Sequence, residues 1–395
     1  MDVISANASA LFSTRASQQA QLENLAQRQL SSALEFFTAQ KYDEAIVTFK
    51  RAISLAPLSS TATSAYDYMA RAYLSKEDVG SAIAAYRESL RGNPTDANAY
   101  AQLGNIYVTQ GDMEQAKTAY QQAVRLDPSS PNRYSLGQAY LELGDYASAI
   151  SEFQAVKELE AGKPNGDYGL GLVYARQGKT EEAVRAFERA ISLQADFWFA
   201  HVELGYALTE LGERDKAAEL VQEMRGQADD LADTLDAYIY EKTPAEMAAV
   251  LATSTFARFS GPKTLVANLD SYLATPGGQQ TFSMVFMFNK DMDAQSVENV
   301  RNWSIARAYD LGRGTIYNYG MTVPDTEIAL DRYPVSVTYN EEDRTATVLF
   351  RVTQNAAGDG TLDPSHIKFS FSGSDTFGQK IGDQADEYLG VRGFA

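Results

Sequence analysis

The sequence predicts a multidomain α + β protein, in which an α-solenoid of about six helix pairs is followed by an antiparallel β-sandwich. Two observations carry this prediction. A helical motif recurs about every 34 residues up to residue 225, and apolar residues alternate with polar ones beyond Gly278. The chain has 395 residues, of which 45% are hydrophobic, and this is enough for two or three domains with packed cores.

The recurring motif pairs an alanine with an aromatic residue four positions later. It occurs at Ala45/Phe49, Ala82/Tyr86, Ala116/Tyr120, Ala149/Phe153 and Ala183/Phe187, and more weakly at Ala217/Val221. An apolar residue, a small residue and a tyrosine precede it, as in Leu103, Gly104 and Tyr107. Both groups have helical spacing, and small residues let helices approach closely. Each unit is therefore predicted to be a helix pair, and Pro57, Pro94 and Pro128 end three of the units.

These residues resemble the tetratricopeptide (TPR) repeat family over roughly Ala26 to Met224, as six units. The resemblance implies a right-handed solenoid over residues 26–225 whose first helices line a concave groove for a protein or peptide. The first and last units depart from the motif, as expected of units that cap a stack. We expect an N-terminal helical extension over residues 1–25. Capping helices (Asp230 to Glu241 and Pro244 to Thr253) and a linker are expected over residues 226–278.

The segment over residues 279–395 has the pattern of strands. "TFSMVFMFNK" places Phe282, Met284, Phe286 and Phe288 on one face, "VSVTYNEEDRTATVLFRV" predicts a hairpin, and a further strand begins near His366. The phrase "FNKDMD" and the strand order resemble bacterial immunoglobulin-like domains of surface-layer and adhesin proteins, over about Thr281 to Leu389. That resemblance implies a spacer, an adhesion module or an assembly contact, not an enzyme.

Gly178, Lys179 and Thr180 match the end of a phosphate-binding loop, but the first glycine of such a loop is replaced by Val173. The repeat explains Gly178 better, because "QGDMEQA", "LGDYASA" and "LGERDKA" carry a glycine at the same place. We therefore predict that Gly178 is a left-handed turn residue between helices. Lys179 is predicted to be solvated and to bind no nucleotide.

Composition excludes several classes of function. The chain has no cysteine and two histidines, which removes thiolate chemistry and zinc sites built from these residues. A net charge of -18 argues against nucleic acid and anionic membranes as partners. No apolar run reaches membrane-spanning length. His201 and His366 are expected to have packing or surface roles, so we predict no enzyme, no catalytic residue and no cofactor.

One acidic loop is a calcium candidate. "NAAGDGTLD" places Asn355, Asp359 and Asp363 around Gly360, and these are the oxygen ligands that calcium uses. The loop lacks the spacing of an EF-hand and its terminal glutamate, so a plain turn is favoured.

The TPR resemblance also assigns the residues of the groove. The matching positions, hereafter the groove face, are Ser64, Asp67, Arg71, Asn98, Ala101, Asn105, Tyr134, Gln138, Tyr168, Leu172, Arg176, Phe199, Val202 and Tyr206. None is a lysine, which excludes the TPR mode that clamps the C-terminal carboxylate of heat-shock chaperones. From its first residues to its last, the groove face changes from polar side chains to aromatic ones. Its aromatic residues either anchor a ligand or pack against neighbouring helices.

Two functions remain open. The protein is either a non-enzymatic adaptor that binds a protein segment in the groove, or a subunit that assembles with itself through its N-terminal helix. The apolar stripe for assembly is Leu22, Leu25, Leu30 and Leu34, although these residues can equally cap their own first repeat. The immunoglobulin-like resemblance favours the cell surface. The N-terminus has no apolar signal segment, which leaves the cytoplasm open, and it weakly resembles flagellin-type proteins exported without a cleaved signal.

Overall fold

The computed structural model describes residues 2–309, 316–382 and 387–388. It divides into two compact units, Met1–Asp236 and Ala237–Ala395, and each is described by itself. Leu389, at which the immunoglobulin-like resemblance ends, lies outside the described residues.

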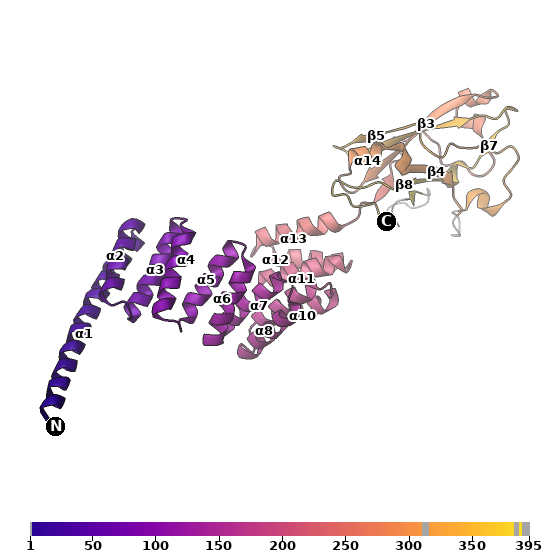
Figure 1. The fold of residues 1–395 in the computed structure, drawn as a ribbon. Coiled ribbons are helices and arrows are strands. Elements are labelled where there is room, and N and C mark those ends of the chain that lie inside the picture. The colour runs from indigo at the N-terminus through magenta and orange to yellow at the C-terminus, as the bar shows by residue number, and fades with distance from the viewer. Residues whose placement is uncertain (1, 310–315, 383–386, 389–395) are drawn as a thin grey trace. The chain divides into compact units, whose positions relative to one another are not determined.

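The first unit is a helical solenoid, in which six helix pairs follow one another along the chain (Figure 1). The pairs are α1 (Asp2–Thr38) with α2 (Tyr42–Leu55), α3 (Ser60–Ser75) with α4 (Val79–Gly92), α5 (Ala97–Thr109) with α6 (Met113–Leu126), α7 (Ser130–Glu142) with α8 (Tyr146–Leu159), α9 (Asn165–Arg176) with α10 (Thr180–Leu193), and α11 (Trp198–Glu210) with α12 (Arg214–Met224). A further helix, α13 (Asp229–Lys242), begins in this unit and confirms the helix predicted over Asp230 to Glu241.

The small residue of the repeat makes room for the aromatic residue of the next helix. A Cβ atom added to Gly104 would lie 2.4 Å from Cε1 of Tyr120, and one added to Gly171 would lie 2.4 Å from Cε1 of Phe187. Both rings are fully buried. The two halves of the motif are therefore one contact, which locks the first helix of a unit against its second.

The turns within the helix pairs share the same backbone geometry. Gly178 has a φ of +70°, which confirms it as the left-handed turn residue between helices. The residue after each turn glycine is the N-cap of the second helix, and there Asp112 accepts a hydrogen bond from the Gln115 N–H at 3.1 Å. Lys179 occupies the same N-cap position of α10, is exposed, and makes no side-chain capping bond.

Replacing Lys179 by aspartate is expected to stabilise the first unit by about 1 kcal/mol, because the new carboxylate would cap α10 as Asp112 caps α6. Lys179→Ala removes the same ammonium group without adding a cap, and should change stability by less than about 0.5 kcal/mol. Urea unfolding followed by far-UV circular dichroism measures both. Equal stability of the two variants would contradict the expectation.

The described residues of the second unit form three antiparallel sheets. They are β1 (Met247–Ala249), β3 (Gln279–Phe288), β6 (Thr345–Thr353) and β5 (Ser336–Asn340) in that order; β4 (Trp303–Arg307), β8 (Ile367–Phe371) and β9 (Glu387–Tyr388); and β2 (Thr264–Leu265) with β7 (Thr361–Leu362). A short helix, α14 (Ala294–Glu298), lies between β3 and β4. The ring of Phe286 lies 5.6 Å from Phe369 and 5.3 Å from Trp303, so the two larger sheets share one core.

The strand predictions for this unit are confirmed. The four apolar residues predicted to share a face of β3 are all buried, and β5 and β6 form the predicted hairpin, with Asn340 opposite Thr345. In the "FNKDMD" phrase, Phe288 and Met292 are buried and Asp293 caps α14. The phrase is therefore the end of a core strand followed by a helix start.

The helix predicted over Pro244 to Thr253 was wrong. Strand β1 lies there instead, with Met247 opposite Phe288 and Ala249 opposite Phe286 on the edge of β3. The helical propensity of this alanine-rich segment is overridden because pairing with an open sheet edge also buries Met247 in the shared core.

Candidate functional site

At the polar end of the groove face, side chains are held by tyrosines of the second helices. Asp67 accepts a hydrogen bond from the Tyr86 hydroxyl at 2.7 Å and pairs with Arg71 at 3.0 Å. Burial, and then the neighbouring Asp67, raises the pKa of Tyr86, so its phenol keeps the proton that it donates. Asn105 accepts in the same way from Tyr120 at 2.7 Å, and burial raises the pKa of Tyr120 to about 12.

In the middle of the groove face, phenylalanines replace these buried tyrosines. The ring of Tyr134 lies 5.3 Å from Phe153, and that of Tyr168 lies 5.9 Å from Phe187 and 4.9 Å from Phe197. Tyr134 and Tyr168 are both half-buried. These two tyrosines therefore pack against neighbouring helices and are only partly available to a ligand.

At the far end of the groove face, Phe199 on α11 is 59% exposed. Leu172 and Tyr206 are half-buried. Arg176 is exposed and pairs with Glu142 at 3.2 Å, while Gln138 is exposed beside Tyr134. This end of the groove face therefore presents an exposed aromatic ring and an exposed cation to a ligand.

Sequence reasoning missed Glu203. Burial raises the pKa of its carboxyl group, and Arg176 opposes that shift. Burial raises the pKa values of Tyr168 and Tyr206, and the negative charge of Glu203 raises both further. Its spacing of four residues from Phe199 could have revealed it, because residues at that spacing share a helix face.

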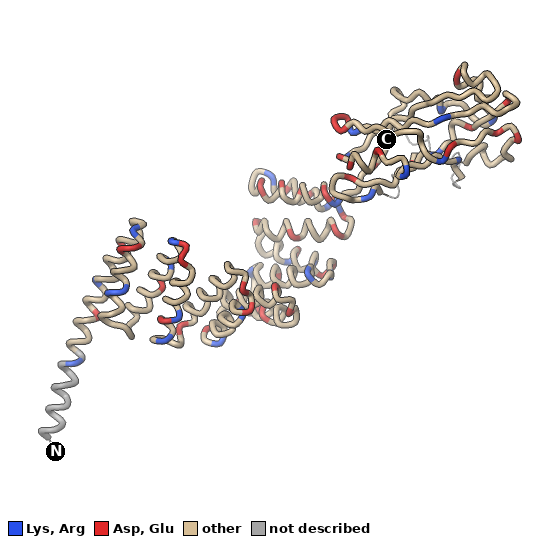
Figure 2. The backbone as a smooth tube through the Cα atoms, turned by 45° about the horizontal axis from the view of Figure 1, so that its top comes forward, with Lys and Arg blue, Asp and Glu red and all other residues tan. Residues whose placement is uncertain are grey.

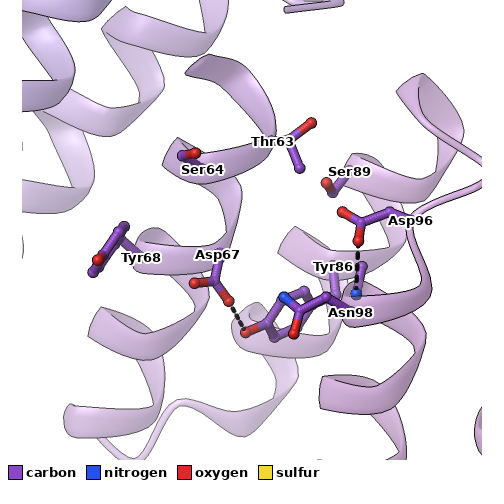
Figure 3. Close-up of a pocket in the computed structure, with 9 residues that line it drawn as sticks. Thr63, Ser64, Asp67, Tyr68, Tyr86, Ser89, Asp96 and Asn98 are labelled. Carbon is purple, nitrogen blue, oxygen red and sulfur yellow. Dashed lines mark hydrogen bonds between the residues drawn. The ribbon is translucent and has the colours of Figure 1, made fainter. Parts of the chain in front are cut away.

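A pocket of about 150 Å³ opens at the polar end of the groove face, between α3, α4 and the start of α5 (Figure 3). Its lining residues are Thr63, Ser64, Asp67, Tyr68, Tyr86, Ser89, Asp96, Asn98 and Ala99. The groove positions Ser64, Asp67 and Asn98 were predicted from the sequence. Ser89 and Asp96 were not predicted, because one lies on a second helix and the other is the N-cap of α5.

Both histidines lie in packed surroundings. Nδ1 of His201 lies 3.2 Å from the Phe197 carbonyl oxygen, and its ring lies 4.9 Å from that of Trp198. Nδ1 of His366 lies 2.8 Å from Oδ2 of Asp363. Both imidazoles are buried, and neither lines the pocket of Figure 3.

The three calcium candidates take part in different hydrogen bonds. Asn355 donates to Asp359 Oδ1 at 2.8 Å, and its own Oδ1 accepts from the Asp359 N–H at 3.1 Å. Asp363 is buried and accepts instead from the Asn318 N–H at 2.7 Å. Within the described residues, no group of three or more acidic or histidine side chains is arranged to hold a metal ion.

The four leucines of the N-terminal helix fall into two pairs. Leu30 is buried in the core of the first repeats and Leu34 packs against that core. Leu22 and Leu25 are 44% and 47% exposed. Only the second pair is free to contact another molecule.

Comparisons with known proteins identify the repeats. Residues 70–111, 104–144, 131–162 and 168–232 match models of the tetratricopeptide repeat. A stretch of 90 residues is 31% identical to Superkiller protein 3 of Schizosaccharomyces pombe. That stretch is 23% of this chain and 6% of the relative, so the chain spans only a small part of that protein.

Several solved structures are similar to part of this chain. A tetratricopeptide repeat protein from Parabacteroides merdae is 16% identical, with a TM-score of 0.48 over 54% of this chain and 85% of that chain. YrrB, described as a TPR protein with an unusual peptide-binding site, is 24% identical, with a TM-score of 0.38 over 44% and 88%. MamA is 28% identical, with a TM-score of 0.37 over 42% and 95%.

The solenoid therefore carries TPR repeats, which are generally non-enzymatic modules for protein–protein interaction. In the part of the chain that the structure describes, no helix is both long and apolar enough to cross a membrane.

Proposed function

We propose that this protein is a non-enzymatic scaffold whose TPR groove binds a peptide or protein segment. The observation that carries the proposal is the composition of the groove face, which has a polar pocket at one end and the exposed ring of Phe199 at the other. Exposed aromatic rings are enriched among the residues that dominate binding energy, and a polar pocket adds specificity.

We propose further that the second unit is an immunoglobulin-like sandwich that tethers the solenoid or mediates adhesion. Its two larger antiparallel sheets with one shared core support this assignment, as does the "FNKDMD" resemblance. In this proposal, the second unit holds the solenoid in place and the groove binds the peptide or protein segment.

Self-assembly through the N-terminal helix is the alternative function, and the exposure of Leu22 and Leu25 favours it. If it holds, light scattering on the full chain over a hundredfold concentration range will show mass growing above the 43.3 kDa monomer. Leu22→Ser with Leu25→Ser should then abolish that growth. A constant monomer mass would exclude this alternative under those conditions.

Peptides selected from a random dodecapeptide library on the full chain test the principal proposal. Fluorescence polarisation with the selected peptides is expected to show at least about tenfold weaker binding to Phe199→Ala, because the variant loses the exposed aromatic anchor. Leu159→Ala is the matched control, since Leu159 on α8 is 56% exposed but lies outside the groove face. It should bind as the native protein does.

Two outcomes would contradict the proposal. One is that no peptide is enriched on the full chain. The other is that Phe199→Ala and Leu159→Ala weaken binding equally, because binding would then depend on general apolar surface and not on the groove.

A further inference from the structure

The pocket between α3, α4 and α5 has the chemistry of a cation site. We propose that it receives the charged end of an arginine or lysine side chain carried by the peptide in the groove. This inference rests on the proposed function, because it names the class of peptide that the groove selects.

The pocket is rich in hydrogen-bond acceptors. Among the side chains that line it, the hydroxyl and carboxylate oxygens come from Thr63, Ser64, Asp67, Tyr68, Tyr86, Ser89 and Asp96. Of the described residues that line the pocket, only Asn98 has an amide N–H₂ group, and none is a lysine, an arginine or a histidine. A guanidinium group has five N–H donors and no acceptor, and an ammonium group has three donors. A basic side chain therefore matches this lining better than an anion or an amide would.

Both carboxylates of the pocket keep acceptor capacity. One oxygen of Asp96 accepts from the Ala99 N–H at 3.1 Å as the cap of α5, and no hydrogen bond within the described residues uses the other. Asp67 accepts one bond from Tyr86 and pairs with Arg71, whose side chain is half exposed. An ionised carboxylate has about four lone-pair sites, so each aspartate can accept from an incoming cation.

The hydroxyl of Ser89 is a further polar group, independent of the carboxylates, that lines the pocket. Its side chain is only 4% exposed, and its hydroxyl takes part in no hydrogen bond found among the described residues. Figure 3 shows this hydroxyl among the side chains that surround the pocket. This hydroxyl is therefore available to accept a hydrogen bond from a donor group bound in the pocket.

Size and charge agree with this occupant. A cavity of about 150 Å³ is large enough for benzene in an engineered protein core, and a guanidinium group has fewer heavy atoms. The net charge of -18 comes from acidic residues that Figure 2 shows along both units, and this charge attracts basic peptides at long range.

A double-mutant cycle between peptide and protein tests the inference. Selected peptides are expected to share a basic residue, and replacing an arginine there by the neutral isostere citrulline should weaken binding about tenfold or more. In the variant Asp67→Asn with Asp96→Asn, the same replacement should change binding by less than about twofold, because the pocket is then neutral. Asparagine still accepts from Tyr86 and still caps α5, so this variant is expected to fold.

Asp112→Asn is the matched control, because Asp112 caps α6 and lies outside the pocket. It should leave the citrulline effect unchanged. If selected peptides bind in a Phe199-dependent way but citrulline costs the same on native protein and on the double variant, the inference is overturned and the proposed function stands. If no peptide binds at all, the proposed function fails as well.

Discussion

Replacing Lys290 by methionine is expected to lower the free energy of unfolding of the second unit by about 3–5 kcal/mol. Lys290 is 2% exposed, and its ammonium donates to Asp375 Oδ2 at 2.5 Å and to the carbonyl oxygens of Glu241 and Thr243 at 3.0 and 2.8 Å. Methionine fills a similar volume but leaves the buried carboxylate of Asp375 without its cation. An unpaired buried charge is among the costliest defects a protein core can hold.

The Lys290 network also joins distant segments of the unit. Lys290 follows β3, Glu241 lies in the last turn of α13, and Asp375 lies beyond β8. The rings of Tyr240 and Phe377 lie 5.0 and 5.1 Å from the ammonium nitrogen and shield it from water. The substitution therefore removes the contacts that hold these three segments together.

Urea unfolding followed by tryptophan fluorescence measures this loss. The chain has two tryptophans, and in a Trp198→Phe background the buried Trp303 reports on the second unit alone. Adding Asp375→Asn to Lys290→Met should recover part of the stability, because it removes the unpaired charge while Oδ1 still accepts from the Phe377 and Gln379 N–H groups. A loss below about 1 kcal/mol, or a double variant no more stable than Lys290→Met, would contradict this account.

Replacing Gly171 by valine is expected to destabilise the first unit by about 3 kcal/mol. Its Cβ alone would overlap the ring of Phe187, which is fully buried and has no free space to enter. The added methyl groups would enlarge the clash and separate α9 from α10. The same variant should also weaken peptide binding, because Leu172 and Arg176 of the groove face lie on α9.

Gly80→Val is the control for this substitution. Gly80 is also helical, but a Cβ added there meets only Oδ1 of Asp78, at 3.9 Å. Its stability, from urea unfolding followed by far-UV circular dichroism, should stay within about 0.5 kcal/mol of the native protein. If both valines cost the same, the effect belongs to helix propensity and not to the contact between Gly171 and Phe187.

The solenoid was predictable because its signal is local and repeated. A unit of about 34 residues contains both helices and the contact between them, so the pairing of Gly104 with Tyr120 is visible as a fixed spacing in the sequence. The turn glycines follow the same period. The strands of the hairpin over β5 and β6 were predictable for a similar reason, since alternation and a short polar turn lie within one stretch of chain.

The remaining features depend on contacts between segments distant in sequence. The residues of β1 have good helical propensity, and only the edge of β3 makes them a strand. The pocket joins Asp67 on α3 to Ser89 on α4 and Asp96 before α5, and the groove pattern covered only the first helices. The spacing of Glu203 from Phe199 places it on the same helix face, but the burial that raises the pKa of its carboxyl group is not visible in that spacing.

The central claim is that the groove face binds a peptide, and hydrogen exchange of the full chain with and without a selected peptide tests it most directly. Ligand binding lowers the frequency of local opening, so the account predicts slower exchange in α3, α5, α7, α9 and α11, the helices that carry the groove face. Protection confined to the second helices or to the second unit would contradict it.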